Sequence, residues 1–291
     1  MKRILVTGAS GYIGRNLSAH LLENGYEVTG TLVDLQKADE LPVGVKPVVT
    51  GAINGQTDWT EALRGADGVV HLAAIVHKKE KKNNETRQLY KRTNTDAAVA
   101  LATQALSVGV KSFVFLSTAA VHGLNKTTEP LTISSPANPK TYYGMSKWEA
   151  EQKLTALFEK ANASLAILRP TMVYGPKAPG NFARLSKMVK MGIPLPLGSI
   201  NNKRHFVFID TLVSLILEEM GNNKPGVTVR LACDDEPVST KELLQLAAKW
   251  EGKKARILPF PSLLLCSFFS FAGKKDDWEK LAESYIITNQ S

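Results

Sequence analysis

Along the first 170 residues, short apolar runs alternate with longer segments in which apolar residues recur at helical period. The runs are apolar nearly throughout, which is typical of strands buried on both faces of a parallel sheet. Strands that alternate with helices in this way favour an α/β fold with a doubly wound parallel sheet. The expected strands are Arg3–Val6, Glu27–Leu32, Lys46–Val49, Gly68–Leu72, Ser112–Leu116 and Leu165–Leu168, and the expected helices are Ile13–Asn24, Trp59–Leu63, Glu85–Val108 and Gly144–Lys160.

The pattern changes after Pro170, where proline and glycine become frequent and the segments between them are shorter and less regular. Such a shift in composition marks a domain boundary. We therefore expect two domains. Residues 1–170 would form the doubly wound sheet, and residues 171–291 mainly a smaller C-terminal lobe, with some segments returning to the first domain.

One long apolar stretch lies in the expected C-terminal lobe. Residues 257–273 carry no charge over 17 residues and are interrupted by Pro259 and Pro261. This length is at the short limit for a membrane span, so a span is not expected. We expect a buried or domain-packing helix, with an interfacial membrane contact or a dimer contact as the alternative.

The net charge is the unusual part of an otherwise ordinary globular composition. The 291 residues are 44% hydrophobic and 22% charged, but 36 Lys and Arg against 27 Asp and Glu leave a net charge of +9. Such an excess suits nucleic acid, an anionic membrane surface or a phosphorylated substrate. Most of it lies in residues 77–92 and Lys249–Arg256. Because the remainder of the chain is nearly neutral, the two basic segments favour diphosphates, and secondarily a membrane surface, over nucleic acid as the partner.

The cysteines and the N-terminus bear on the expected location. The chain has two cysteines, Cys233 and Cys266, with no CxxC motif and no histidine pair at ligand spacing. Neither a disulfide framework nor a metal site is therefore expected. The first apolar run is only four residues long, too short for a signal peptide. We expect a cytoplasmic protein.

A glycine-rich turn follows the first expected strand and opens directly into a helix. Its sequence, TGASGYIG, places Gly8, Gly11 and Gly14 in GxxGxxG spacing. Such glycines permit a tight turn, close approach of the backbone to a pyrophosphate, and close packing of helix on strand. The N-terminus of the helix then points its free N–H groups at the phosphates. This turn predicts a dinucleotide site, which makes residues 1–170 a Rossmann domain.

The form of the dinucleotide is left open by the residues after the second expected strand. NAD sites usually carry an acidic residue about 20 positions past the glycines. Asp34 lies one or two residues later than expected, and Arg15 could instead meet a 2′-phosphate. We expect NAD, and NADP is not excluded.

Tyr143 and Lys147 stand four residues apart on an expected helix and therefore share one of its faces. A nearby ammonium stabilises a phenolate, so we expect Lys147 to lower the pKa of Tyr143 and make it a usable acid and base near neutral pH. Tyr142 is off that face. Alone, this spacing is a weak signal, since chance often produces it.

Together with the glycine turn and FLSTAAVHG at Phe115–Gly123, this pair resembles the extended short-chain dehydrogenase/reductase family, the NAD-dependent epimerase/dehydratase group. The resemblance is closest to bacterial UDP-sugar 4-epimerases and 4-keto-sugar reductases. Other matching segments are His71–Ala74, Asn94, Leu168–Pro176, Asn181–Leu185, Pro194–Gly198, Lys203–Val213 and Glu236–Leu244.

The resemblance implies a role for each matching residue. Thr118 would hydrogen-bond the substrate oxygen at C4, Tyr143 would take and return the hydroxyl proton, and Lys147 would hold the nicotinamide ribose. In the lobe that would bind substrate, Asn181 and Arg204 would contact the nucleotide diphosphate. The residues implied at the cofactor are Gly8, Ser10, Gly11, Tyr12, Ile13, Gly14, Ile53, Leu72, Ala73, Ala74, Asn94, Ser117, Tyr143, Lys147 and Pro170.

The chain departs from the family pattern in two places. Ala52 stands where an aspartate often contacts the adenine, which again leaves NAD and NADP open. Ala119 and Ala120 stand where the 4,6-dehydratases carry the acidic pair that performs the elimination. Alanine cannot move protons, so dehydration is not expected.

Two polar features near the expected cleft have more than one reading. His71 and His122 lie at strand ends and are expected to be packing or solvent-facing residues and not ligands or bases, with a substrate contact as the alternative for His122. Residues 77–92 carry seven Lys and Arg against two acids. We expect a solvated loop there, with a basic lid over a diphosphate as the alternative.

The expected function is therefore epimerisation at C4 of a UDP-hexose through a transient 4-keto sugar, with NAD or NADP as cofactor. An NAD(P)H-dependent reductase of a 4-keto-6-deoxy nucleotide sugar uses the same residues and stays open. A non-catalytic dinucleotide-binding module would need only the glycine turn, so Thr118, Tyr143 and Lys147 count against it. The expected partners are a UDP-sugar, a second copy in a homodimer and a weak membrane-surface contact, without nucleic acid.

Overall fold

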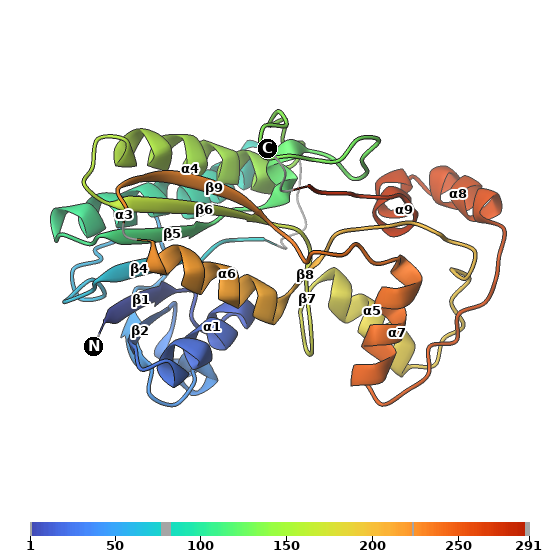
Figure 1. Ribbon diagram of the computed structural model, residues 1–291, viewed down its shortest axis with the longest axis horizontal. Helices are drawn as coiled ribbons and strands as arrows, with labels where there is room; N and C mark the ends of the chain where they lie inside the picture. Colours follow the sequence, from blue (N-terminus) through green and yellow to red (C-terminus); the bar gives the residue numbers. More distant parts are fainter. Residues whose placement is uncertain (1, 77–82, 223, 289–291) are drawn as a thin grey trace. The chain divides into compact units, whose positions relative to one another are not determined.

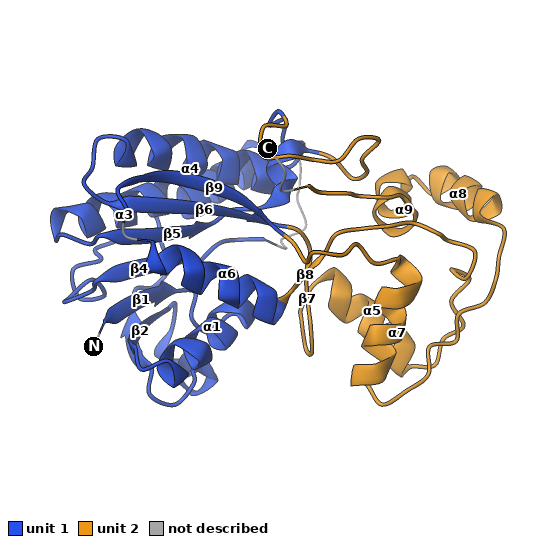
Figure 2. Cartoon of the chain, in the orientation of Figure 1, with its two compact units in different colours: residues 1–123, 136–170, 209–232 blue, residues 124–135, 171–208, 233–291 orange. Residues whose placement is uncertain are grey.

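The structure is a computed structural model that describes residues 2–76, 83–222 and 224–288 (Figure 1). The chain divides into two compact units, shown in different colours in Figure 2. Unit 1 holds residues 1–123, 136–170 and 209–232, and unit 2 holds residues 124–135, 171–208 and 233–291. Residues 209–232 return to the first unit, and residues 124–135 leave it for the second.

Unit 1 contains a seven-stranded parallel sheet in the order β3-β2-β1-β4-β5-β6-β9. This order confirms the doubly wound fold, because the chain moves outward in one direction from β1 and then in the other from β4. Strand β9 was not expected. The strands are β1 Arg3–Thr7, β2 Glu27–Leu32, β3 Lys46–Val49, β4 Gly68–His71, β5 Ser112–Leu116, β6 Ser164–Pro170 and β9 Gly226–Ala232.

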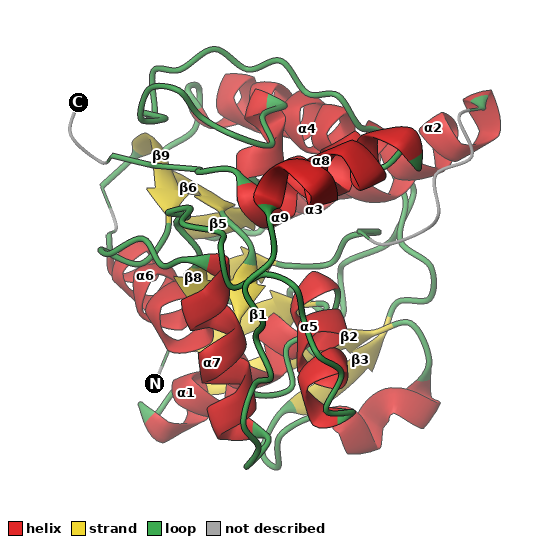
Figure 3. Cartoon of the chain, turned by 90° about the vertical axis from the view of Figure 1, so that its right-hand side faces the viewer, coloured by secondary structure: helices red, strands yellow, loops and turns green. Residues whose placement is uncertain are grey.

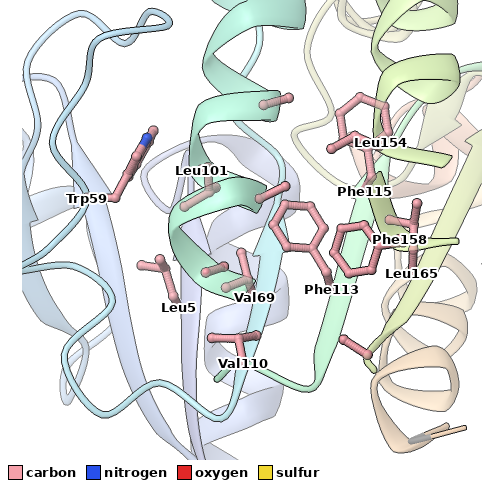
Figure 4. Close-up of a cluster of buried hydrophobic side chains, with 14 of the residues drawn as sticks. Leu5, Trp59, Val69, Leu101, Val110, Phe113, Phe115, Leu154, Phe158 and Leu165 are labelled. Atoms are coloured by element: carbon pink, nitrogen blue, oxygen red, sulfur yellow. The ribbon is translucent and has the colours of Figure 1, made fainter. Parts of the chain in front are cut away.

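Helices cover both faces of this sheet (Figure 1). Helices α1 (Tyr12–Glu23) and α6 (Ile209–Gly221) pack together on one face, and α3 (Ala97–Ser107) and α4 (Tyr142–Phe158) pack on the other. Between α3, α4 and the sheet lies an extensive apolar cluster of unit 1 (Figure 4). Its fully buried rings are Trp59, Phe113, Phe115 and Phe158.

Two of the expected helices differ in the structure. The helix expected at Trp59–Leu63 is wrong: these residues form hydrogen-bonded turns, in which the Leu63 amide donates to the Trp59 carbonyl at 2.8 Å. The helix expected over Glu85–Val108 is present, but as α2 (Asn84–Tyr90), a π-helical segment η2 (Lys91–Asp96) and α3. Such wide turns within helices frequently occur at functional sites.

Unit 2 is built from short elements joined by long loops, and Figure 3 shows its helices in red. An aromatic group of Tyr174, Phe182, Phe206, Phe208 and Trp250 packs with ring centroids 5.4–6.2 Å apart. The elements are β7 Val173–Tyr174, α5 Asn181–Lys190, β8 Val207–Phe208, α7 Thr240–Trp250, α8 Ser262–Phe271 and α9 Lys275–Ala282.

Residues 257–273 were expected to form a buried or domain-packing helix; helix α8 is not buried, but one of its sides packs against unit 2. None of its ten residues is buried. One side of the helix, with Leu265, Cys266 and Phe269, packs against an apolar cluster of unit 2 that includes Val189 and Leu195. Within the described residues, no helix has both the length and the apolar character needed to cross a membrane.

Candidate active site

The glycine turn has the geometry that its spacing predicts. Gly8 has a φ of +67°, which a side chain would strain. The Gly11 amide donates to the Gly8 carbonyl at 3.0 Å. A Cβ on Gly14 would lie 2.3 Å from that same carbonyl oxygen, so only glycine fits where α1 crosses the turn.

The N-terminus of α1 suits the diphosphate of a dinucleotide. Its N-cap residue, Gly11, makes no side-chain hydrogen bond to the helix, and the first turn contains no acidic residue. The first N–H groups of a helix lack intrahelical acceptors and carry partial positive charge. Because no side chain competes for them, these groups are free to meet phosphate oxygens, and the turn fits the cofactor.

The residues after β2 bear on the form of the cofactor. The Asp34 carboxylate accepts from the Gln36 amide at 3.0 Å at the start of the turn of η1 (Leu35–Glu40). Arg15, the residue that could meet a 2′-phosphate, lies 3.5 Å from the Glu40 carboxylate. The guanidinium thus already has an anionic partner.

Thr7 joins the glycine turn to the loop after β4. Its Oγ1 accepts from the amides of Leu72 and Ala73, each at 3.2 Å, and donates to Nδ1 of His71 at 2.7 Å. His71 is fully buried, and burial, with a smaller effect of Lys147, lowers its pKa to about 3. The neutral ring confirms the packing role expected for His71.

Asn94 and Thr95 tie the same loop to helix α4. The Asn94 amide group donates to the Ile75 carbonyl at 3.0 Å and accepts from the Ile75 amide at 2.8 Å. It also donates to Ser146 Oγ at 3.0 Å, and the Thr95 hydroxyl donates to the Ser146 carbonyl at 2.8 Å. Both residues lie in η2, whose wide turn places consecutive side chains against α4.

Thr118 lies directly after β5, at the start of the short turn η3 (Ala119–His122). Its Oγ1 accepts from the Ala120 amide at 3.2 Å. A hydrogen bond with Thr118 lowers the pKa of Tyr143, but burial outweighs it and raises that pKa to about 12. The structure thus brings the predicted hydroxyl and phenol together, although the pKa of Tyr143 is raised, not lowered as expected.

Lys147 lies one turn along α4 from Tyr143 and is 1% exposed. Its ammonium donates to the Leu116 carbonyl at 2.8 Å and lies 4.4 Å from the centroid of the Phe115 ring. Burial lowers the pKa of Lys147 to about 7, and the charge of Glu151 opposes that shift. The ammonium is therefore held at the carboxyl end of β5, close to where Thr118 begins η3.

Behind Lys147 lies a buried ionic network that the sequence analysis missed. Glu151, 2% exposed, accepts from Arg169 Nη2 at 2.6 Å and from Arg169 Nε at 3.1 Å, and also accepts from the Ser117 hydroxyl. Arg169 Nη1 lies 3.3 Å from Nε2 of His122, which is buried as expected for a packing residue. Two signals could have revealed the pair: Glu151 follows Lys147 by four residues, and Arg169 interrupts an apolar strand.

The predicted cofactor residues of unit 1 that lie in loops follow the carboxyl ends of its strands, the edge where ligands bind in this fold. Ile53, in the loop after β3, packs against the main apolar cluster and lines a cavity of about 530 Å³. The cavity is also lined by Ala52, Leu89 and Arg92. Pro170 ends β6, and Leu72, Ala73 and Ala74 follow β4. Residues 77–82 of the segment expected to be a solvated loop, with a basic lid as the alternative, lie outside the described residues.

Asn181 and Arg204 belong to unit 2. Asn181 is exposed and begins α5. Arg204 is 8% exposed, and its terminal nitrogens donate to the carbonyls of Asn125, Glu279 and Glu283 at 2.6–3.2 Å. Three carbonyls accept from the terminal nitrogens, which favours a structural role over the predicted diphosphate contact, while the buried Nε has no hydrogen-bond partner in the described part of the chain.

The parallel sheet, the glycine turn and the Thr118, Tyr143 and Lys147 group together define a dinucleotide-dependent enzyme. Residues 4–230 match the model of the NAD dependent epimerase/dehydratase family. The chain belongs to this family, which confirms the resemblance seen in its motifs, and its cofactor is NAD.

Similar proteins agree with this membership. The UDP-glucose 4-epimerase of Vibrio cholerae is 38% identical over 284 residues, which is 96% of this chain and 85% of that protein. The N-acetyl-alpha-D-glucosaminyl-diphospho-ditrans,octacis-undecaprenol 4-epimerase of Escherichia coli O157:H7 is 28% identical and covers 97% of this chain and 83% of that one. The solved UDP-glucuronic acid 4-epimerase of Bacillus cereus, in complex with NAD, has a TM-score of 0.71 at 25% identity and covers 89% of this chain and 87% of its own.

Proposed function

We propose that this protein is an NAD-dependent epimerase that inverts C4 of a nucleotide sugar, with a UDP-hexose as substrate. The observation that carries the proposal is the hydrogen-bonded pair of Thr118 and Tyr143, which shares one edge of the sheet with the glycine turn. The names of the Vibrio and Bacillus relatives, both UDP-sugar 4-epimerases, support C4 as the reacting position.

Each residue of the group has a task in this reaction. Bound NAD would supply a reversible hydride acceptor for C4, so that the hydride could leave one face of the sugar and return to the opposite face. Tyr143 takes the proton of the C4 hydroxyl as the hydride leaves and gives it back when the hydride returns. Thr118 hydrogen-bonds the C4 oxygen and stabilises its developing charge, and Lys147 holds the nicotinamide ribose. Because hydride and proton both return, no reducing equivalent is consumed.

Tyr143 must ionise for this step, and its pKa of about 12 opposes ionisation. Lys147 is the cation available within one helical turn. Glu151 raises the pKa of Lys147 and so favours its charged form. We propose that the Glu151 charge keeps Lys147 cationic, which in turn favours the phenolate of Tyr143.

The proposal also covers the nucleotide diphosphate and the absence of a dehydratase step. Asn181 is our candidate for the diphosphate contact, supported by its exposure at the start of α5. For Arg204 the packing supports a structural role. Ala119 and Ala120 supply no acid or base, which argues against a dehydratase.

We also propose a cytoplasmic homodimer with a weak contact to a membrane surface. The cytoplasmic location is supported by Cys233 and Cys266, which are both free thiols. Light scattering of the purified protein measures the oligomeric state, and a monomeric mass would overturn the dimer.

The activity test uses the purified protein with UDP-galactose and UDP-N-acetylgalactosamine, followed by NMR without added nicotinamide. We expect interconversion with the C4 epimer and NAD released on denaturation, because the cofactor is regenerated at each turnover. Strict dependence on added NADPH would instead identify the reductase. Failure to convert any UDP-, GDP- or dTDP-sugar would overturn both.

A further inference from the structure

Helix α8 presents a row of large apolar side chains to solvent. Leu263 is 81% exposed, Leu264 59%, Phe268 66% and Phe271 96%. Leu258 and Phe260, just before the helix, are 51% and 40% exposed. Since Leu265, Cys266 and Phe269 hold the other side of α8 against the apolar cluster of unit 2, the exposed side belongs to a packed helix. Scattered exposed apolar residues are ordinary, but contiguous ones mark interaction surfaces.

Cations bracket this apolar helix at both ends. Lys253, Lys254 and Arg256 precede it, and Lys274 and Lys275 follow it. All five are exposed, and residues 252–275 contain no Asp or Glu. None of the five takes part in an ion pair within the described residues. The next acids, Asp276 and Asp277, begin α9.

A binding partner of α8 has to cover its exposed apolar side chains and also neutralise the five flanking cations. A second copy docked through a two-fold contact would bring the same five cations together without acids between them, which is unfavourable. A bilayer with anionic lipids offers apolar chains to the leucines and phenylalanines and negative headgroups to the lysines. With ten residues, α8 spans about 15 Å, roughly half of a hydrocarbon core, so it would lie in the headgroup region and not cross.

We infer that α8 and its flanking cations, residues 253–275, form a docking surface for an anionic membrane. The apolar side chains enter the headgroup boundary and the five cations bind lipid phosphates. This surface belongs to unit 2 and is independent of the proposed epimerase chemistry. Binding is reversible, since one short helix buries little area and the electrostatic part is screened by salt.

The test is flotation of the purified chain with extruded vesicles. We expect partition into vesicles of equal phosphatidylcholine and phosphatidylglycerol at low salt, and little into phosphatidylcholine alone. Replacing Lys253, Lys254, Lys274 and Lys275 by Gln should lower the partition coefficient about a hundredfold or more, because each lysine near an anionic surface contributes to binding. The triple variant Leu264→Ser, Phe268→Ser and Phe271→Ser should lower it at least about tenfold.

Matched controls separate docking from general stickiness. Lys2, Lys140, Lys160 and Lys241 are exposed lysines elsewhere, and their replacement by Gln removes the same charge. Val43, Val108 and Met191 are 101%, 58% and 63% exposed, and their replacement by Ser removes comparable apolar groups.

Both control variants should float like the parent chain. Equal partition into the two vesicle types, or equal losses in test and control variants, would overturn the inference. So would a dimer in solution that the α8 triple variant dissolves, since the face would then bind a second copy. Epimerase turnover is not part of the readout, so a negative result leaves the proposed function intact.

Discussion

Units 1 and 2 both bury polar side chains, but they pair them differently. In unit 1 the buried Glu151 binds the side chains of Arg169 and Ser117. In unit 2 the buried Asn202 and Arg204 bind mainly backbone carbonyls in the last turns and at the C-cap of α9, including that of Glu283. The first arrangement joins side chains that can carry charge, whereas the second satisfies carbonyls that the end of a helix leaves without intrahelical partners.

The difference shows what each unit needs its polar groups for. The sheet of unit 1 satisfies its own backbone, so its buried side chains are free for chemistry at the carboxyl edge. In unit 2 a side chain also satisfies the start of a helix, as when the backbone N–H of Thr240 at the beginning of α7 donates to Asn202 Oδ1 at 3.0 Å. The buried Glu151 of unit 1 therefore indicates chemistry, whereas the buried Asn202 of unit 2 indicates backbone architecture.

The largest effect expected in unit 1 follows from Tyr143→Phe. Removing the phenol should lower turnover about 10²–10⁴-fold, the usual contribution of a general acid and base, while NAD stays bound. The control is Tyr142→Phe on the same helix, which should keep its turnover. Single-turnover kinetics and the content of bound NAD measure the two quantities. Unchanged turnover of Tyr143→Phe would falsify the catalytic assignment.

Glu151→Ala should cost about 3–5 kcal/mol of unfolding free energy, because Arg169 is left buried without its counter-ion. The matched control is Glu149→Ala on the same helix, where the Lys153 partner at 2.8 Å is 43% exposed and the loss should stay within about 1 kcal/mol. Urea denaturation measures both. Equal losses of unfolding free energy in the two variants would contradict the prediction that the buried ion pair contributes more than the exposed one.

Arg204→Ala tests the unit 2 side of the comparison. Three carbonyls lose a charged donor, so we expect a loss of about 2 kcal/mol in unfolding free energy, against less than about 0.5 kcal/mol for the exposed Arg184→Ala. KM for the nucleotide sugar should change little in protein that remains folded. A raised KM with unchanged unfolding free energy would instead show that Arg204 contacts the diphosphate of the substrate.

A pH dependence of stability is also expected, which His71 should cause. The pKa of His71 is lowered from 6.5 to about 3 in the folded chain. Between about pH 6.5 and 3 the unfolded chain therefore binds a proton at His71 that the folded chain does not bind. Unfolding free energy should therefore fall as the pH drops from about 6.5 towards 3, by at most about 1.4 kcal/mol per pH unit. His71→Phe keeps a ring beside Phe115 and should flatten this slope, measured by urea melts between about pH 6.5 and 4.5. Parallel slopes would show that His71 titrates normally.

The features that the sequence predicted are those imposed by backbone geometry. Gly8 and Gly14 are required by a positive φ and by a 2.3 Å approach, and the spacing of Tyr143 and Lys147 by the pitch of a helix. Strands buried on both faces were visible as apolar runs. Such constraints act within a few residues, so they can be read along the chain.

The features that were missed depend on distant parts of the chain. Strand β9 contains Arg230, whose charge hides the strand pattern and which pairs with Glu218 and Glu219 at 2.8 Å. The ion pair of Glu151 and Arg169 joins a helix to a strand 18 residues away. The exposure of one side of α8 depends on how much of the helix packs on residues distant in sequence, such as Val189 and Leu195.

Strand β9 also bears on how the protein is made. It completes the sheet beside β6, yet residues 171–208, which belong to unit 2, are synthesised between them. At a synthesis rate of about 5–20 residues per second, β6 stays an unpaired sheet edge for several seconds on the ribosome, although all of its residues are buried in the folded chain. A fragment cut at Pro170 would keep that edge exposed, and exposed strand edges are prone to aggregation.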